Sequence, residues 1–192
     1  MLLQWNRSNS IDITMIATLT KKLTKAEFWA LADASDLTYE LIDGIAVAKM
    51  SPKYFHARSA RRILYILQEW AKDRGRTEME WAFDLSDNYT PVPDLIYVSF
   101  DRLPESWNEN AACPVPPELA IEIISPGQTF GQMIQKASSY LTGGVLQVWV
   151  VDPTAKSVTV LYVDRAPKTY LNGEIIVDYL FPELSVEIDR LF

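Results

Sequence analysis

The residues best suited to chemistry are two carboxylates that fall beside or inside apolar segments. Asp94 directly follows Pro93 at the start of the run 95–98, and Glu122 interrupts the otherwise apolar run 119–124. A carboxylate in such a run is rarely buried unless it is paired or binds a metal ion. If the two runs form neighbouring strands, the carboxylates meet at one sheet edge, where their oxygens suit Mg²⁺ or Mn²⁺.

A lysine on the next predicted helix completes this set. Lys136 lies fourteen residues after Glu122, and helical spacing places it beside Met133 and Tyr140, next to the apolar stripe. Two carboxylates, a metal ion and an ammonium group are the components of phosphodiester hydrolysis. The metal lowers the pKa of a water molecule, and the lysine stabilises developing charge or orients that water.

Each of the three residues also has a plainer interpretation. An aspartate after a proline suits a turn at the entrance of a strand. Glu122 and Lys136, or Glu122 and an arginine, suit a buried ion pair without catalysis. A lysine on a helix is commonly solvated. The residues alone therefore leave catalytic and structural roles open.

The scarcity of two residue types excludes several other chemistries. The chain of 192 residues has one cysteine, Cys113, and one histidine, His56. It therefore cannot form an intramolecular disulfide, a zinc cluster of cysteines and histidines, or a c-type haem attachment. Ser125, before Pro126, has no second histidine from which to build a hydrolase triad and is interpreted as a turn or cap. The aromatic residues Phe130, Tyr140 and Trp149 are interpreted as core.

Length and hydropathy predict one folded domain without a membrane-spanning segment. No stretch approaches the roughly 20 consecutive apolar residues needed to cross a bilayer, and no secretory signal is recognised, so we expect a cytoplasmic protein. Residues 1–17 show no clear periodicity and are interpreted as a loosely ordered extension, followed by a single domain over residues 18–192.

Turn and capping signals divide the chain into helices and strands. Thr24 and Glu27 form a capping box that starts a short helix, and Asp43-Gly44 predicts a type I′ hairpin turn. We expect an α/β (α+β) fold, with an N-terminal helix and hairpin before a mixed sheet flanked by helices. The expected hairpin strands are 38–42 and 45–50, the later strands are 77–85, 94–100, 118–124, 145–152, 157–164, 169–171 and 186–189, and the two longer helices are 54–73 and 129–141.

Several short motifs, in this order and spacing, resemble the Uma-two family, a large group of predicted restriction endonucleases. The resemblance covers about residues 18–192. The motifs are Tyr39-Glu40-Leu41-Ile42-Asp43-Gly44, Ser51-Pro52, His56, Pro93-Asp94, Glu122, Ser125-Pro126, Lys136, Tyr140, Gly144 and Val148-Trp149-Val150-Val151-Asp152-Pro153.

This resemblance implies a restriction-endonuclease-like fold of the PD-(D/E)XK superfamily. It also implies a Mg²⁺ ion held by Asp94, Glu122 and the backbone carbonyl of Ile123. The superfamily's lysine normally stands two residues after the glutamate, where this chain has Ile124. The family pattern has a lysine on the next helix instead, and Lys136 occupies that place.

Two further residues are candidates for accessory roles, and one segment is a candidate for binding DNA. Glu40 is expected either to reach the edge of the site or to form a cross-strand polar pair. His56 is expected to contact phosphate, to act as a base, or to be a satisfied structural residue. The net charge of −7 argues against a polyanionic partner, but residues 53–76 carry a local charge of +5. The helix face opposite the apolar stripe carries Arg58, Arg61, Arg62 and Lys72, which suit either a nucleic-acid backbone or plain solvation.

The first hypothesis is a metal-dependent DNA endonuclease that uses Asp94, Glu122 and Lys136. A homodimer is expected because two sites most simply cut both strands. The alternative is a catalytically silent module that keeps the fold and binds nucleic acid or another protein. An acidic sugar- or nucleotide-binding enzyme ranks lower because the chain lacks a Gly-rich phosphate loop.

Overall fold

The structure, a computed structural model, describes residues 21–192, and the extension predicted for residues 1–17 lies outside them. Helix α1 (Lys25–Asp33) begins at the predicted capping box, in which the Thr24 side chain accepts from the Glu27 amide. Strands β1 (Tyr39–Ile42) and β2 (Ile45–Ala48) form the predicted hairpin. Its turn residues Asp43 and Gly44 have φ values of 51° and 82°, as a type I′ turn requires.

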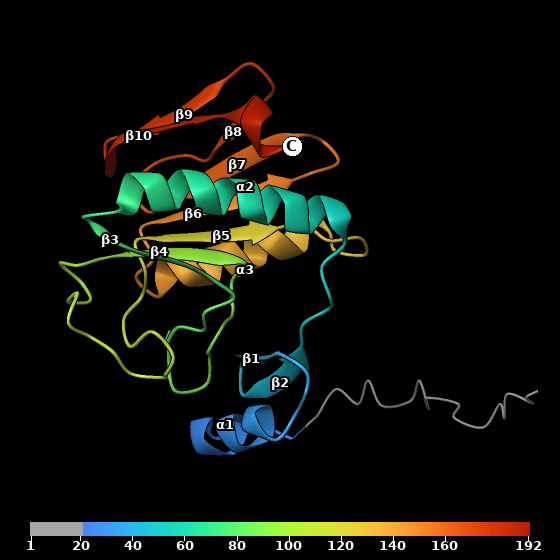
Figure 1. The fold of residues 1–192 in the computed structure, drawn as a ribbon. Coiled ribbons are helices and arrows are strands. Elements are labelled where there is room, and N and C mark those ends of the chain that lie inside the picture. Colours follow the sequence, from blue (N-terminus) through green and yellow to red (C-terminus); the bar gives the residue numbers. More distant parts are fainter. Residues whose placement is uncertain (1–20) are drawn as a thin grey trace, which may run out of the picture.

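A six-stranded mixed sheet forms the centre of the fold, in the order β3-β4-β5-β6-β7-β8 (Figure 1). Only β5 and β6 pair in parallel, and helix α3 connects them. The other neighbours pair antiparallel. The strands are β3 (Gly75–Met79), β4 (Leu95–Ser99), β5 (Leu119–Ile123), β6 (Gln147–Asp152), β7 (Ser157–Tyr162) and β8 (Lys168–Tyr170).

The two long helices cover opposite faces of this sheet (Figure 1). Helix α2 (Tyr54–Ala71) buries Ala60, Ile63 and Leu67 against the face that carries the odd-numbered residues of β5. Helix α3 (Phe130–Thr142) buries Met133, Ala137 and Tyr140 against the other face, which includes Ala120. Glu122 has the parity of Ala120, so its side chain belongs to the α3 face.

A second hairpin ends the chain on the α2 side of the sheet. It pairs β9 (Ile175–Asp178) with β10 (Phe181–Glu187), and a short 3₁₀ helix, η2 (Ile188–Leu191), follows. Buried side chains of these elements join the α2 core. The α+β class, the mixed sheet and the N-terminal helix and hairpin are therefore confirmed.

The structure differs from the sequence-based expectations in four details. The strand expected over 77–85 ends at Met79, because Glu80 has a φ of 50°, which extended strands do not adopt. Strand β9 was not predicted, and β10 begins at Phe181 rather than Val186. Phe130 is 47% exposed and does not belong to the core, because it begins α3 at the rim.

The close approach of β3 to β4 gives a prediction that is independent of function. A Cβ atom at Gly75 would lie 2.7 Å from Tyr97 Cε2 and 2.8 Å from Ser99 Cα, and it would also clash with the Val98 carbonyl. We expect Gly75→Ala to lower the free energy of unfolding by roughly 1–3 kcal/mol in urea denaturation. Gly131→Ala is the control, because the nearest atom to its Cβ is 4.0 Å away. A Gly75→Ala variant with the same free energy of unfolding as the wild type would contradict this packing.

Candidate active site

Strands β4 and β5 bring Asp94 and Glu122 to the same end of the sheet. Leu95 pairs with Ile121 in the antiparallel register. Asp94 directly precedes Leu95 and Glu122 directly follows Ile121, so both residues lie at the same end of this strand pair. The Asp94 amide donates to the Ile121 carbonyl at 3.1 Å, and the Ile123 amide donates to Asp94 Oδ2 at 2.7 Å. Both residues are buried, with 5% and 3% of their surface exposed.

Asp94 is held in its ionised form. Lys49 Nζ lies 3.1 Å from its Oδ1, and His56 Nε2 lies 3.0 Å from its Oδ2. Because an ionised carboxylate only accepts, His56 donates through Nε2. Burial opposes ionisation, but the hydrogen bond from His56 and the charge of Lys49 outweigh it and lower the pKa of Asp94 to about 2.

Glu122 has the opposite electrostatic environment. Burial raises its pKa to about 7; Lys136 opposes this shift, while the charges of Asp94 and Glu40 add to it. Its Oε1 accepts from the Tyr140 hydroxyl at 2.7 Å and lies 2.9 Å from Lys136 Nζ. Adjacent carboxylates with such different proton affinities are typical of sites that perform chemistry.

Lys136 joins α3 to the N-terminal hairpin. Its ammonium lies 2.8 Å from Glu40 Oε1 as well as 2.9 Å from Glu122 Oε1. Burial disfavours the charged lysine, but the two carboxylates raise its pKa above the usual value. Glu40 stands opposite Val47 in the hairpin, so it forms no cross-strand polar pair. It reaches Lys136 and the Val92 amide instead.

These side chains line one cavity of about 210 Å³, which we call the acidic cavity. Its ionisable lining has four carboxylates and two lysines, so its formal charge is −2 when His56 is neutral. These residues are Glu40, Lys49, His56, Glu80, Asp94, Glu122 and Lys136.

The donor set of the acidic cavity fits a small hard cation. Mg²⁺ is usually bound through one or two carboxylates and keeps several waters; Asp94 and Glu122, with the Ile123 carbonyl, offer such a set. The residual negative charge and the raised pKa of Glu122 also indicate that an added cation would be stabilised here. Over residues 21–192, no cluster of three or more histidine, cysteine, aspartate or glutamate side chains is arranged as a complete metal cage.

Two side chains, Lys49 and Tyr140, form polar contacts in the site that were not expected from the sequence. Lys49 follows β2 and donates to the Val92 carbonyl at 2.8 Å as well as contacting Asp94. No local pattern marks it, because its partners lie more than forty residues away. Tyr140 is fully buried, as its interpretation as core required, but its hydroxyl contacts Glu122.

The basic residues of α2 do not line the acidic cavity. Arg61 and Lys72 are exposed, with Lys72 directly after the last helical residue, Ala71. Arg58 is half-buried, and its guanidinium lies over the rings of Tyr54 and Phe55. Arg62 is also half-buried and donates to the backbone carbonyl of Phe192. Arg61 and Lys72 are therefore the members of the predicted set best exposed to a ligand.

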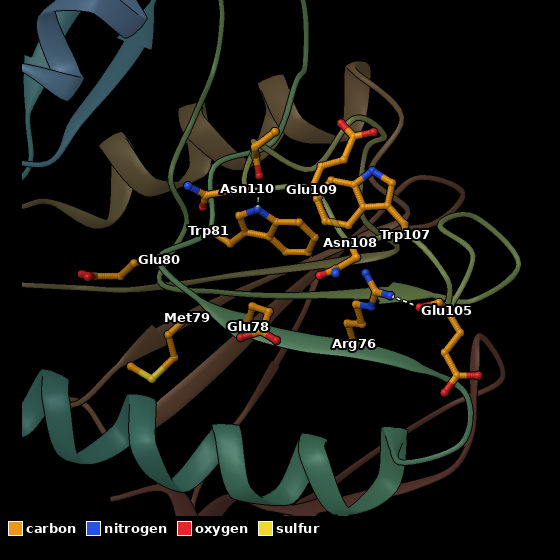
Figure 2. A pocket seen from close by; sticks show the side chains of 11 residues that line it. Arg76, Glu78, Met79, Glu80, Trp81, Glu105, Trp107, Asn108, Glu109 and Asn110 are labelled. Atoms are coloured by element: carbon orange, nitrogen blue, oxygen red, sulfur yellow. Dashed lines mark hydrogen bonds between the residues drawn. The ribbon is translucent and has the colours of Figure 1, made fainter.

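A separate cavity of about 550 Å³, the tryptophan cavity, lies between β3 and the loop 105–111 (Figure 2). The rings of Trp81 and Trp107 lie 5.5 Å apart. One cation, Arg76, faces a lining with four carboxylates, a balance that disfavours a phosphate group. These carboxylates belong to Glu78, Glu80, Glu105 and Glu109. Glu80 also lines the acidic cavity, but none of the predicted catalytic residues lines the tryptophan cavity.

Comparison with known proteins decides the family. Residues 26–189 match the family model of Uma-two, which is described as "Putative restriction endonuclease". The chain belongs to the Uma-two family. The resemblance noted in the sequence motifs is therefore confirmed, and the Uma-two match includes every residue of the acidic cavity. The comparison with curated proteins gave no match.

One solved structure supports the fold of this Uma-two chain. It is the crystal structure of a protein titled a "putative nuclease belonging to DUF820" from Anabaena variabilis ATCC 29413. The TM-score is 0.73 at 22% sequence identity, over 82% of this chain and 91% of the other. At this identity the similarity establishes the shared fold.

Proposed function

We propose that this Uma-two protein is a metal-dependent endonuclease that hydrolyses DNA phosphodiester bonds. One observation carries the proposal: two buried carboxylates, one directly before β4 and one in the adjacent β5, share a cavity with a lysine whose ammonium lies 2.9 Å from one of them. The matched family model is described as "Putative restriction endonuclease", so we expect this cavity to act on DNA.

Asp94, Glu122 and the Ile123 carbonyl are the groups that would hold Mg²⁺ or Mn²⁺. The bound ion would supply Lewis acidity and lower the pKa of a water molecule. Asp94 is ready to bind a cation because its pKa of about 2 keeps it ionised at neutral pH. His56 and the Ile123 amide fix its Oδ2, which orients the carboxylate.

Lys136 is proposed to stabilise negative charge on the phosphate or to orient the attacking water. Its ammonium remains protonated because Glu122 and Glu40 raise its pKa. Glu40 acts as a positioning residue, since it holds the same ammonium that contacts Glu122. Lys49 is a second cation of the acidic cavity and faces Asp94.

The basic face of α2 is proposed to contact the DNA backbone, chiefly through Arg61 and Lys72. Exposed cations bind phosphates without sequence specificity. A homodimer is proposed because a double-strand cut is most simply made by two sites. No helix in the described part of the chain is long and apolar enough to cross a bilayer.

Incubation of plasmid DNA with the purified protein tests the activity. We expect nicking or linearisation with Mg²⁺ or Mn²⁺ and none with EDTA. Asp94→Asn and Glu122→Gln keep side-chain size but remove the carboxylates, and each is expected to lower the rate at least 10²–10³-fold, as for other groups that stabilise a transition state. Equal residual cleavage in both variants and the wild type would indicate contamination and remove the proposal.

A catalytically silent binding module is the second candidate. The contacts of Lys136 with Glu40 and Glu122 favour it, because they also satisfy a plain buried ion network. This candidate predicts DNA binding that is identical with and without Mg²⁺, and no metal-dependent change in melting temperature. A melting shift that Asp94→Asn abolishes would exclude it.

A further inference from the structure

A second cavity of about 440 Å³, which we call the glutamine cavity, adjoins the acidic cavity. The two cavities share Glu40, Val47, Gln128 and Lys136 as lining residues. The ion pair between Lys136 and Glu40, at 2.8 Å, therefore stands at the boundary between them. A substrate held by the proposed metal ligands would extend past this ion pair into the glutamine cavity.

The lining of the glutamine cavity combines apolar side chains with hydrogen-bonding groups. Ile42 and Val47 come from the N-terminal hairpin, Met133 comes from α3, and Tyr89 contributes a half-buried ring. The volume lies within the range typical of small-molecule sites. Apolar walls with a few polar groups suit a planar heteroaromatic ring with a polar edge.

Two glutamine side chains in this lining are held through their carbonyl oxygens. Gln128 Oε1 accepts from the Ser125 amide at 2.8 Å. Gln132 Oε1 accepts from the Thr129 amide at 2.8 Å and from its hydroxyl at 3.1 Å. With each carbonyl oxygen engaged, the NH₂ group is left as the free end, and within residues 21–192 no protein acceptor contacts either one. Gln128 and Gln132 are exposed and line the cavity, so their NH₂ groups are available as hydrogen-bond donors at its rim.

The charge of the glutamine cavity favours a base over a phosphate. Its ionisable lining consists of Glu40 and Asp43 against Lys136, apart from the Tyr89 phenol. This net negative charge repels a phosphate, whereas the adjacent acidic cavity is where a metal ion would attract one. The glutamine cavity therefore suits the base of a nucleotide, and the acidic cavity with a bound metal ion suits its phosphate.

We propose that the glutamine cavity binds one unstacked nucleobase of the substrate, next to the phosphate that is cleaved. This inference rests on the proposed function. A base can enter a cavity of this kind only from a single strand or after rotation out of the duplex. The NH₂ groups of Gln128 and Gln132 select base edges that carry acceptors, and guanine offers O6 and N7 together.

Single-stranded 12-mers test the base requirement. Cleavage of an unmodified strand first identifies the scissile bond, and an abasic residue is then placed on either side of it. We expect the abasic substitution on one side to weaken binding about tenfold, measured by fluorescence anisotropy with Ca²⁺ in place of Mg²⁺. Unchanged affinity and unchanged cleavage with both abasic strands would overturn the inference.

Gln132→Glu tests the donor selection. Glutamate keeps the acceptor of the capping box at the start of α3, so the helix should remain stable, but it replaces the NH₂ donors with an acceptor. We expect the preference for guanine over adenine at the identified position to fall at least fivefold. Asn172→Asp is the matched control, because it makes the same charge change in the exposed turn between β8 and β9.

The outcomes separate this inference from the proposed function. If the wild type cleaves DNA in a metal-dependent way but Gln132→Glu leaves the base preference equal to that of Asn172→Asp, the base site is excluded and the nuclease remains. If no strand is cleaved, the abasic residue is instead moved through every position of the 12-mer. Weakened binding at one position then means that the proposed chemistry fails and that the cavity still binds a base.

Discussion

The Lys136→Met variant is expected to lose DNA cleavage by roughly 10²–10³-fold and stability by about 3–5 kcal/mol at pH 8. The stability falls because Glu40 and Glu122 remain buried without the ammonium that both contact. Urea denaturation measures the stability, and plasmid cleavage measures the activity. Lys168→Met is the control, because it removes an exposed lysine from β8.

A double variant separates the two roles of Lys136. Adding Glu122→Gln to Lys136→Met removes one of the uncompensated charges, so it should recover part of the stability. It should recover none of the cleavage, because the ammonium and a metal ligand are both missing. If Lys136→Met alone cleaves DNA at the wild-type rate when assayed below its unfolding temperature, the lysine is only a structural partner.

The metal-free protein is expected to lose roughly 3 kcal/mol of stability as the pH rises from about 4.5 to about 7. The ordinary pKa of a glutamate carboxyl is 4.5, whereas that of Glu122 in the folded protein is about 7. Between these values the folded state binds a proton that the unfolded state has released, so raising the pH favours unfolding. The lowered pKa of Asp94 changes the stability only below about pH 3.8, which is outside this pH range.

Urea titrations across this pH range, in EDTA, measure the loss. Glu122→Gln cannot titrate and should give a flatter curve and higher stability at pH 8. Glu69→Gln, at an exposed carboxylate on α2, should keep the wild-type pH dependence. Mg²⁺ should raise the melting temperature more at pH 8 than at pH 5, because protonated Glu122 is a poor ligand. A Glu122→Gln curve with the wild-type slope would contradict the assigned electrostatics.

The fold was predictable where short-range signals are strong. The Thr24 and Glu27 capping box and the Asp43-Gly44 turn depend on neighbours within three residues, and both are in the structure. The end of β3 was not predictable, because the positive φ of Glu80 has no sequence signature in a glutamate. Strand β9 is short and mostly exposed, so it shows little hydrophobic contrast.

The site residues that could be predicted are those whose charge lies in an apolar segment of the sequence. Glu122 was recognisable because a carboxylate in an apolar strand needs a partner. Lys49 gave no such signal, since it lies at the end of a half-exposed hairpin and meets Asp94 only through the tertiary fold. The contact of Arg62 with Phe192 joins residues 130 positions apart, so the helix pattern alone placed this arginine on the solvent-exposed face.

The ion pair between Glu40 and Lys136 spans 96 positions of the chain. During synthesis, Glu40, Asp94 and Glu122 all leave the ribosome before Lys136, and α3 can dock only after its own residues have followed. An incomplete chain therefore holds Glu40 and Glu122 without their ammonium partner, Lys136. If the protein cuts DNA as proposed, this order of assembly delays activity until most of the polypeptide has been made.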